Sequence, residues 1–210
     1  MLNAVFDTLH DLRDLLRRTP PVPFAILVPG LAILFVWPLL RVALDDARGT
    51  FMAAFVIAMG LRFVMRADGL IRHSRSRMSG KATVIVAMLA GPGGMALAIW
   101  GANPMWCQQF LSVYFLLIAA LYVIDVIDGK HALVQFHWPD PSMRPADATL
   151  TRVMAIFNLA MVLLNETLIT HTSQNAWLLY FGLLPLLSHV VIAAIVRTVY
   201  AGKCDPVRVG

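Results

Sequence analysis

Apolar and polar positions alternate in long blocks along this chain. Apolar runs follow one another, and the connections between them range from a few residues to about twenty. Because a helix needs about 20 predominantly apolar residues to cross the hydrocarbon core, these blocks predict about six membrane-spanning helices. The candidate spans are 24–44, 51–66, 82–100, 105–127, 150–170 and 176–199. The expected fold is therefore an all-α, polytopic transmembrane helix bundle.

Two of these candidate spans carry an irregular feature. The run 51–66 is short and contains Arg62. It is either a tilted span with a snorkelling arginine or part of a hairpin with 24–44 that does not fully cross. The run 82–100 contains GPGG at 91–94. A kink with tight helix packing is the favoured interpretation there, and a broken helix that lines a binding site is the alternative.

The N-terminal residues have a different pattern. Residues 1–18 place apolar side chains at helical spacing, with aspartate and arginine on the other face. This pattern predicts an amphipathic helix in the membrane interface plane, or one that packs on a partner subunit. The prolines of TPPVP end it. The predicted organisation is an interfacial helix and proline-rich linker at 1–23, a transmembrane domain at 24–200 and a cytoplasmic tail at 201–210.

Lysine and arginine predict the orientation, because cytoplasmic loops carry their excess. If the N-terminus lies inside, the outer loops carry Arg41 and Arg48. The inner segments then carry Arg13, Arg17, Arg18, Arg66, Arg72, Arg75, Arg77, Lys81, Lys130, Arg144, Arg197, Lys203 and Arg208. Both termini are therefore expected in the cytoplasm.

Composition excludes a soluble domain and narrows the partners. The 210 residues are 59% apolar and 14% charged, with a mean hydropathy of +0.73. The formal charge of +5 does not indicate nucleic-acid binding, because the basic residues lie between apolar runs and form no patch with interleaved aromatics. Cys107 and Cys204 lie far apart without a CxxC partner, so the sequence predicts neither a metal site nor a disulfide framework.

Several polar residues lie inside the apolar runs, where ionisable groups are costly and are candidates for function. Glu166 belongs to the fifth span, and Asn158 and Asn165 share one face of that helix. A proton or cation site, or a contact with a lipid headgroup, is the functional interpretation. The favoured alternative is an interhelical hydrogen-bond anchor to Gln108 or Gln109 in the fourth span.

The motif DVIDGKHA at 125–132 resembles the first half of the CDP-alcohol phosphotransferase signature, D-x-x-D-G-x-x-A-R. The matching positions are Asp125, Asp128, Gly129 and Ala132. In that family, carboxylates hold divalent metal ions that bind a diphosphate. The second acidic half is absent, since its places hold Ser142, Ala146 and Leu150. We interpret the match as chance and predict no metal, cofactor or catalytic residue.

The stretch from 150 to 186 resembles the C-terminal part of the YciB/IspZ family, also called septation protein A. The residues that carry the resemblance are Leu164, Asn165, Glu166, Ser173, Trp177, Phe181, Gly182, Pro185 and Leu186. The tryptophan follows the glutamate at the family's spacing.

The resemblance implies a multi-pass protein of the bacterial inner membrane that serves envelope maintenance and septation. It would act as a non-enzymatic scaffold in contact with the lipid bilayer and with division or envelope proteins. One alternative is an accessory transmembrane subunit of a larger respiratory, photosynthetic or transport complex, suggested by the short 51–66 run and by the amphipathic N-terminus, which could need a partner surface. A weaker alternative is a small transporter or lipid-handling enzyme centred on Glu166 or on Asp125 and Asp128.

Overall fold

The computed structural model describes residues 24–44, 46–74, 93, 96, 100, 101 and 103–204. The predicted helix at 1–18, most of the predicted span 82–100, including all of its GPGG motif except Gly93, and the tail beyond 204 lie outside the described residues. The described elements are α2 (Phe24–Ala43), α3 (Ala47–Ser74), α5 (Pro104–Asp128), α6 (Ala132–His137), the 3-10 helix η1 (Pro141–Ala146), α7 (Asp147–His171) and α8 (Gln174–Cys204).

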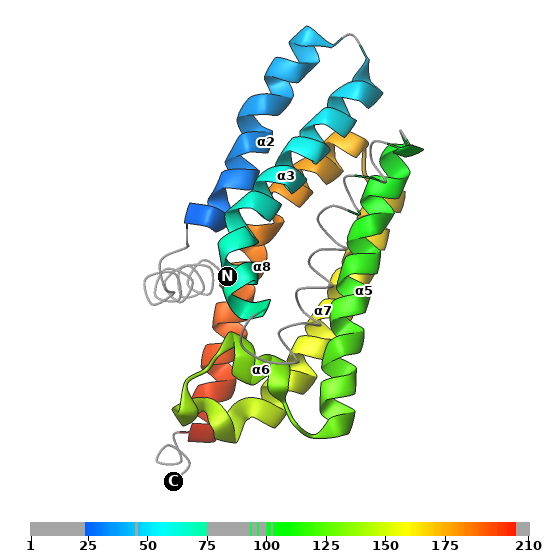
Figure 1. Cartoon of the computed structure of the whole chain (residues 1–210). Coiled ribbons are helices and arrows are strands. Elements are labelled where there is room, and N and C mark those ends of the chain that lie inside the picture. Colours follow the sequence, from blue (N-terminus) through cyan, green and yellow to red (C-terminus); the bar gives the residue numbers. More distant parts are fainter. Residues whose placement is uncertain are drawn as a thin grey trace, which may run out of the picture.

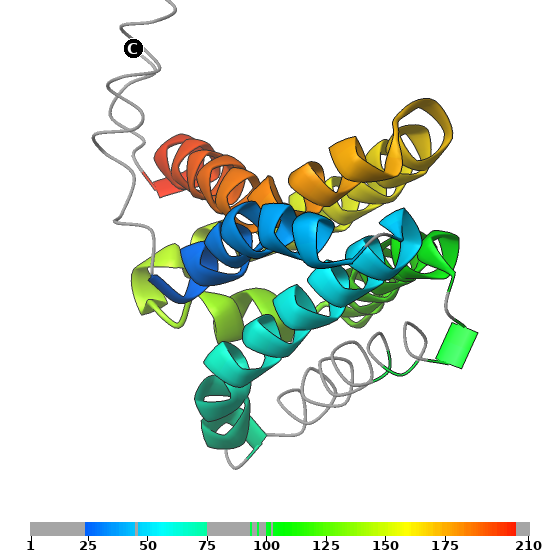
Figure 2. The same ribbon diagram turned by 90° about the horizontal axis from the view of Figure 1, so that it is seen from above.

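Two antiparallel helix pairs and one bridging helix make up the described bundle (Figure 1). Helices α2 and α3 form the first pair, α5 and α7 form the second, and α8 packs against both (Figure 2). The α2–α3 turn, the start of α5 and the α7–α8 turn lie at one end, which we call the upper end. Helices α6 and η1 and the end of α8 lie at the opposite, lower end.

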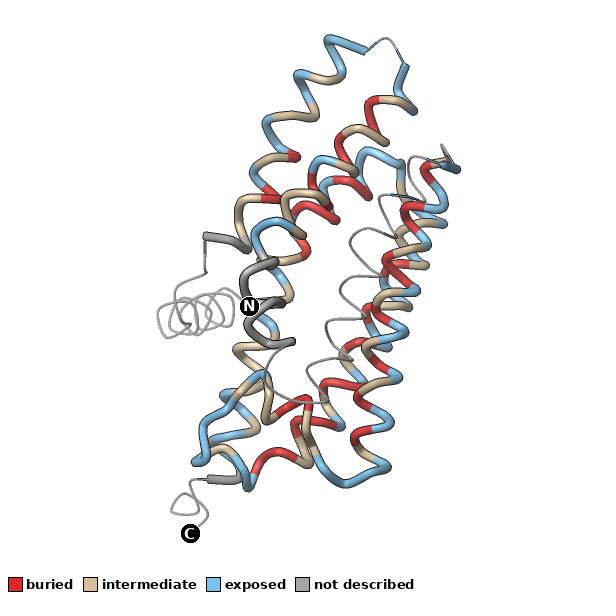
Figure 3. Tube along the Cα trace, in the orientation of Figure 1, coloured by how far each residue is buried: buried red, intermediate tan, exposed pale blue. Residues whose placement is uncertain are grey.

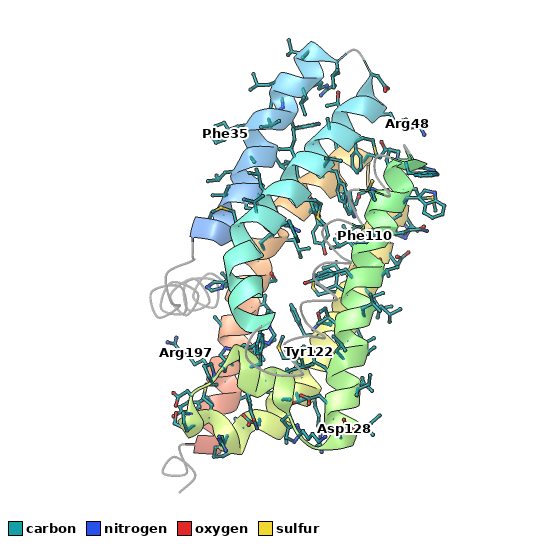
Figure 4. The ribbon with its side chains drawn as sticks, in the orientation of Figure 1. Phe35, Arg48, Phe110, Tyr122, Asp128 and Arg197 are labelled. Carbon is teal, nitrogen blue, oxygen red and sulfur yellow. The ribbon has the colours of Figure 1, made fainter. Side chains whose placement is uncertain are left out.

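Four described helical stretches are long and apolar enough to cross a membrane. They are Ala47–Met65, Pro104–Asp128, Pro141–His171 and Gln174–Tyr200. The apolar part of α2, Leu27–Ala43, is shorter. Large apolar side chains on the outside, such as Phe35 on α2, point away from the bundle, as expected for a lipid-facing surface (Figure 4). The predicted all-α transmembrane bundle is confirmed for the described residues.

Local capping explains where the helices begin and end. The Asp46 carboxylate accepts hydrogen bonds from the backbone N–H groups of Arg48, at 3.0 Å, and Gly49, at 2.8 Å. Helix α3 therefore starts before the predicted span 51–66 and continues well past it. In the second helix pair, the Asn103 side-chain oxygen accepts a hydrogen bond from the Met105 N–H at 3.0 Å and so caps the start of α5.

Helix α5 ends at Asp128, just before a residue whose backbone conformation favours glycine. Gly129 has a φ of 65°, in the left-handed region, and its N–H donates to the Val126 carbonyl. The chain turns there into the short helix α6. The connection between the predicted spans 105–127 and 150–170 is thus mostly helical and contains α6 and η1.

Buried side chains gather in two clusters (Figure 3). The upper cluster is built around four stacked or tilted rings that we call the aromatic core: Phe51, Phe55, Trp177 and Phe181. The lower cluster joins the lower halves of α5 and α7 to α6; it contains Tyr122, Leu133, Val134, Leu150 and Met154. Side chains from α3 and α8 thus meet in the aromatic core.

Helices α2 and α8 approach closely at two glycines. A Cβ atom placed on Gly30 would lie 2.4 Å from the carbonyl oxygen of Gly182, which is closer than van der Waals contact permits. A Cβ atom on Gly182 would lie 3.4 Å from the nearest atom of Ile33, an ordinary contact. Small residues allow such close backbone approach between membrane helices. The crossing therefore requires glycine at 30 and tolerates alanine at 182.

Replacing Gly30 with alanine should destabilise the bundle by about 1–3 kcal/mol, because α2 must move away from α8. The matched change Gly182→Ala should cost less than about 1 kcal/mol. Thermal unfolding of both variants in the same detergent would measure the difference. Equal destabilisation by the two changes would contradict the close contact at Gly30.

Candidate functional site

Asn165 lies at the centre of a polar network inside the upper half of the bundle. Its side chain is fully buried. Its Nδ2 donates to the Gln108 carbonyl oxygen at 2.9 Å and to the Ser112 Oγ at 2.8 Å, both on α5. Its Oδ1 accepts from the Trp177 Nε1 of α8 at 2.9 Å. Asn165 thus joins α5, α7 and α8. These bonds satisfy polar groups inside the bundle, because lipid chains offer no hydrogen-bond partner.

The network continues to Glu166. The Ser112 hydroxyl donates to the Glu166 Oε1 at 2.5 Å. Trp177, Asn165 and Ser112 therefore each donate to the next residue in a row that ends at Glu166, and we call these four residues the polar chain. Its last member is a carboxyl group, which in its ionised form only accepts hydrogen bonds. Successive bonds in such a row polarise one another and strengthen the last bond.

The structure brings together some of the predicted site residues and separates others. Asn165 and Glu166 belong to the polar chain, and Gln108 contributes its backbone carbonyl. Gln109 is exposed on the outside of α5. Asn158 is buried on the predicted face, but its Nδ2 donates to the Met154 carbonyl of its own helix, at 2.7 Å. The polar stripe on α7 is thus not one continuous site.

Ser112 was missed by the sequence analysis. It lies one helical turn after Gln108 on α5, so both positions face the same way. A small polar residue in line with a glutamine inside an apolar helix was the signal that could have identified it.

Arg62 lies against α8. One interpretation of the run 51–66 was a tilted span whose arginine snorkels toward the membrane surface, but the Arg62 side chain bonds to a neighbouring helix. Its Nη2 donates to the Phe181 carbonyl oxygen at 2.7 Å, and its guanidinium carbon lies 4.1 Å from the centre of the Phe181 ring. Pro185, four residues further along α8, has no N–H to donate to that carbonyl. Arg62 therefore satisfies a carbonyl that the proline leaves without its helical partner and adds a cation–π contact.

The positions that carry the family resemblance mostly lie in the contacts between helices. Trp177, Phe181 and Gly182 are buried: Trp177 contacts α7 and α3, Phe181 contacts α3, and Gly182 contacts α2. Leu164, in contrast, is exposed on the outer surface of α7.

At the lower end, Asp125 has a structural role. Its two carboxylate oxygens accept from the backbone N–H groups of Ala132, at 2.8 Å, and Leu133, at 3.0 Å. These bonds hold the start of α6 against the end of α5. Asp128 is exposed at the end of α5 (Figure 4). The two aspartates of the DVIDG motif therefore do not face one common site.

Other polar side chains also secure this end of the bundle. The buried Asp147 carboxylate accepts a hydrogen bond from the Gln135 Nε2 at 2.9 Å. The Thr151 Oγ1 lies 3.1 Å from the His131 Nδ1, within hydrogen-bonding distance. The exposed Asp140 caps η1, and the backbone N–H of Ser142 lowers the pKa of this carboxyl group. Among the described residues, no group of three or more His, Cys, Asp or Glu side chains could hold a metal ion.

Replacing Asp125 with alanine should destabilise the protein by about 1–3 kcal/mol, because two buried or partly buried N–H groups lose their acceptor. Asp125→Asn should cost less, since an amide oxygen still accepts one bond. Asp128→Ala is the matched control and should change the unfolding temperature little. Unfolding of the three variants in detergent would test this, and a larger effect at Asp128 than at Asp125 would contradict the capping role.

Comparison with protein-family models, with curated proteins and with solved structures gives no match. The fold and its apolar surface define the class of protein: an all-helical bundle suited to a lipid bilayer.

Proposed function

We propose that this chain is a non-enzymatic scaffold of the bacterial inner membrane that serves cell-envelope maintenance and septation. The observation that carries the proposal is the position of the residues that resemble the YciB/IspZ family. Asn165 and Trp177 bond to each other, Phe181 contacts Arg62, and Gly182 contacts Gly30. These residues connect α8 to α7, α3 and α2.

Because these side chains make contacts between helices, they favour a structural role for the protein over a catalytic one. A catalytic group must be free to meet a reacting atom in the substrate. The amide of Asn165 already makes three hydrogen bonds within the bundle, and the Trp177 N–H makes one. Such bonds fix the relative positions of helices, which a scaffold needs in order to present a constant outer surface.

The described charges support an orientation with the lower end in the cytoplasm. At the lower end lie Lys130 in the α5–α6 loop, Arg144 on η1 and Arg197 near the end of α8, whereas Arg41 and Arg48 lie at the upper end (Figures 1 and 4). The excess of basic residues at the lower end agrees with the positive-inside rule.

The length of α3 weakens one argument for the accessory-subunit alternative. That alternative rested partly on the short apolar run 51–66, which would need a partner to cover it. Helix α3 has 28 residues, and its stretch Ala47–Met65 is long and apolar enough to cross a membrane. Sizing the protein in mild detergent separates the two proposals, because a subunit of a large complex should purify with companions and a self-contained bundle should not require them for stability.

Deleting the gene in the bacterium that encodes it should impair envelope integrity or misplace the septum. A plasmid copy should restore both. Variants such as Gly30→Ala should restore function in proportion to the amount of folded protein in the membrane, because a scaffold acts through its surface. Normal envelope and division in the deletion strain would contradict the proposal.

A further inference from the structure

The polar chain ends on a carboxyl group that is not fully covered by the bundle. Asn165 and Trp177 are completely buried, and Ser112 is nearly so, whereas Glu166 is partly exposed. Ser112 donates to one carboxyl oxygen, Oε1. Each donor of the polar chain thus bonds to the next group, and the last acceptor is the Glu166 carboxyl group at the surface of α7.

Glu166 lies near the upper border of the hydrocarbon core. Helix α7 has 25 residues and is about 37 Å long, whereas the hydrocarbon core is about 30 Å thick. The ends of α7 therefore reach the headgroup regions. Glu166 precedes the last helical residue, His171, by five positions, or about 7.5 Å. Its side chain can reach the level where acyl chains meet headgroups.

Other exposed residues near the upper end are also typical of the border between acyl chains and headgroups. Trp106 and Gln109 are exposed near the start of α5, at the upper end, and Thr170 is exposed on α7. Tryptophan is enriched at membrane interfaces because its ring is apolar and its N–H is polar. The partly exposed Glu166 carboxyl group is therefore closer to the lipid headgroups than to the centre of the bilayer.

We propose that Glu166 binds the primary ammonium group of an aminophospholipid, such as phosphatidylethanolamine, in the leaflet at the upper end. An ammonium group carries the opposite charge and donates hydrogen bonds, and such charge-assisted bonds are about twice as strong as neutral ones. The quaternary ammonium of phosphatidylcholine has no N–H to donate. The site therefore selects lipids by the protons on the headgroup nitrogen. This inference does not depend on the proposed envelope function.

The test uses the full-length protein in detergent, titrated with phosphatidylethanolamine or phosphatidylcholine of identical acyl chains. Native mass spectrometry gives the bound lipid, and the unfolding temperature gives the stabilisation. The wild type should bind phosphatidylethanolamine about tenfold more tightly, the value expected for a hydrogen bond to a charged group. Glu166→Gln should remove this preference, and Ser112→Ala should weaken it. Asp128→Asn, the same loss of charge at the lower end, should leave it intact.

A second measurement requires no variant and so does not depend on whether Glu166→Gln folds. The wild type is titrated with lipids whose headgroup nitrogen carries one, two or three methyl groups. Affinity should fall most sharply at the third methyl group, when the last N–H is lost. Equal affinity along the series, or an unchanged preference in Glu166→Gln, would overturn the proposal. A third result would also overturn the proposal: a companion protein that purifies with the wild type but not with Glu166→Gln, while lipid binding is the same in both. Glu166 would then bind a partner helix.

Discussion

Replacing Asn165 with leucine should destabilise the bundle by about 2–4 kcal/mol, because three hydrogen bonds between helices are lost together. The buried N–H of Trp177 also loses its acceptor and finds no water in the membrane. Leucine has the same number of side-chain heavy atoms and the same branching as asparagine, so the change leaves no cavity. Unfolding in detergent, followed by circular dichroism, would measure it.

Asn158→Leu is the matched control for this prediction. Asn158 is also buried on α7, but its amide donates to the Met154 carbonyl of its own helix. Its loss should cost about 1 kcal/mol or less. A double-mutant cycle of Asn165→Leu with Trp177→Phe should show coupling, since the two residues share a bond. Equal costs at Asn158 and Asn165, or independent effects at 165 and 177, would show that the network does not hold the helices together.

Replacing Arg62 with methionine should cost about 2–3 kcal/mol, because the Phe181 carbonyl loses its donor and its ring loses the cation. Methionine keeps most of the apolar stem of the side chain. The change should also increase bending of α8 around Pro185, where the helix lacks one backbone bond. The unfolding free energy in detergent is the measurement for this prediction as well.

The role assigned to Arg62 is tested most sharply in a background of Pro185→Ala. That change restores an N–H group four residues after Phe181, which can then donate to the same carbonyl. Arg62→Met should therefore cost clearly less in the Pro185→Ala background than in the wild type. An identical cost in both backgrounds would mean that Arg62 does not replace the bond that the proline removes.

The positions of the helices could be predicted well from the sequence where the apolar runs have clear polar ends. The predicted spans 105–127, 150–170 and 176–199 match α5, α7 and α8 within a few residues. The predicted span 51–66 is shorter than helix α3. Hydropathy indicates where a helix can cross lipid, but it does not indicate where a capping residue starts the helix. Asp46 starts α3 before the apolar run, and the helix continues through polar residues to Ser74.

The candidate site could be predicted only in part, for a physical reason. Helical periodicity indicated that Asn158 and Asn165 face the bundle, and both are buried. Periodicity does not indicate which side chain of another helix lies opposite. The bonds of Asn165 to Ser112 and Trp177, and that of Arg62 to Phe181, depend on how neighbouring helices are rotated and offset. Asn158 could equally have bonded across the bundle, but it bonds to its own helix.

The most direct test of the account is the sidedness of the two ends of the bundle in the cell membrane. Single cysteines would be placed at Gln174, the first residue of α8, and at Lys130, in the α5–α6 loop, with Cys107 and Cys204 replaced by alanine. Both chosen positions are exposed. An impermeant maleimide added to spheroplasts should label position 174 at once and position 130 only after the membrane is opened. Labelling of both positions in sealed spheroplasts, or recovery of the protein in the soluble fraction, would contradict a bundle that crosses the membrane with its lower end inside.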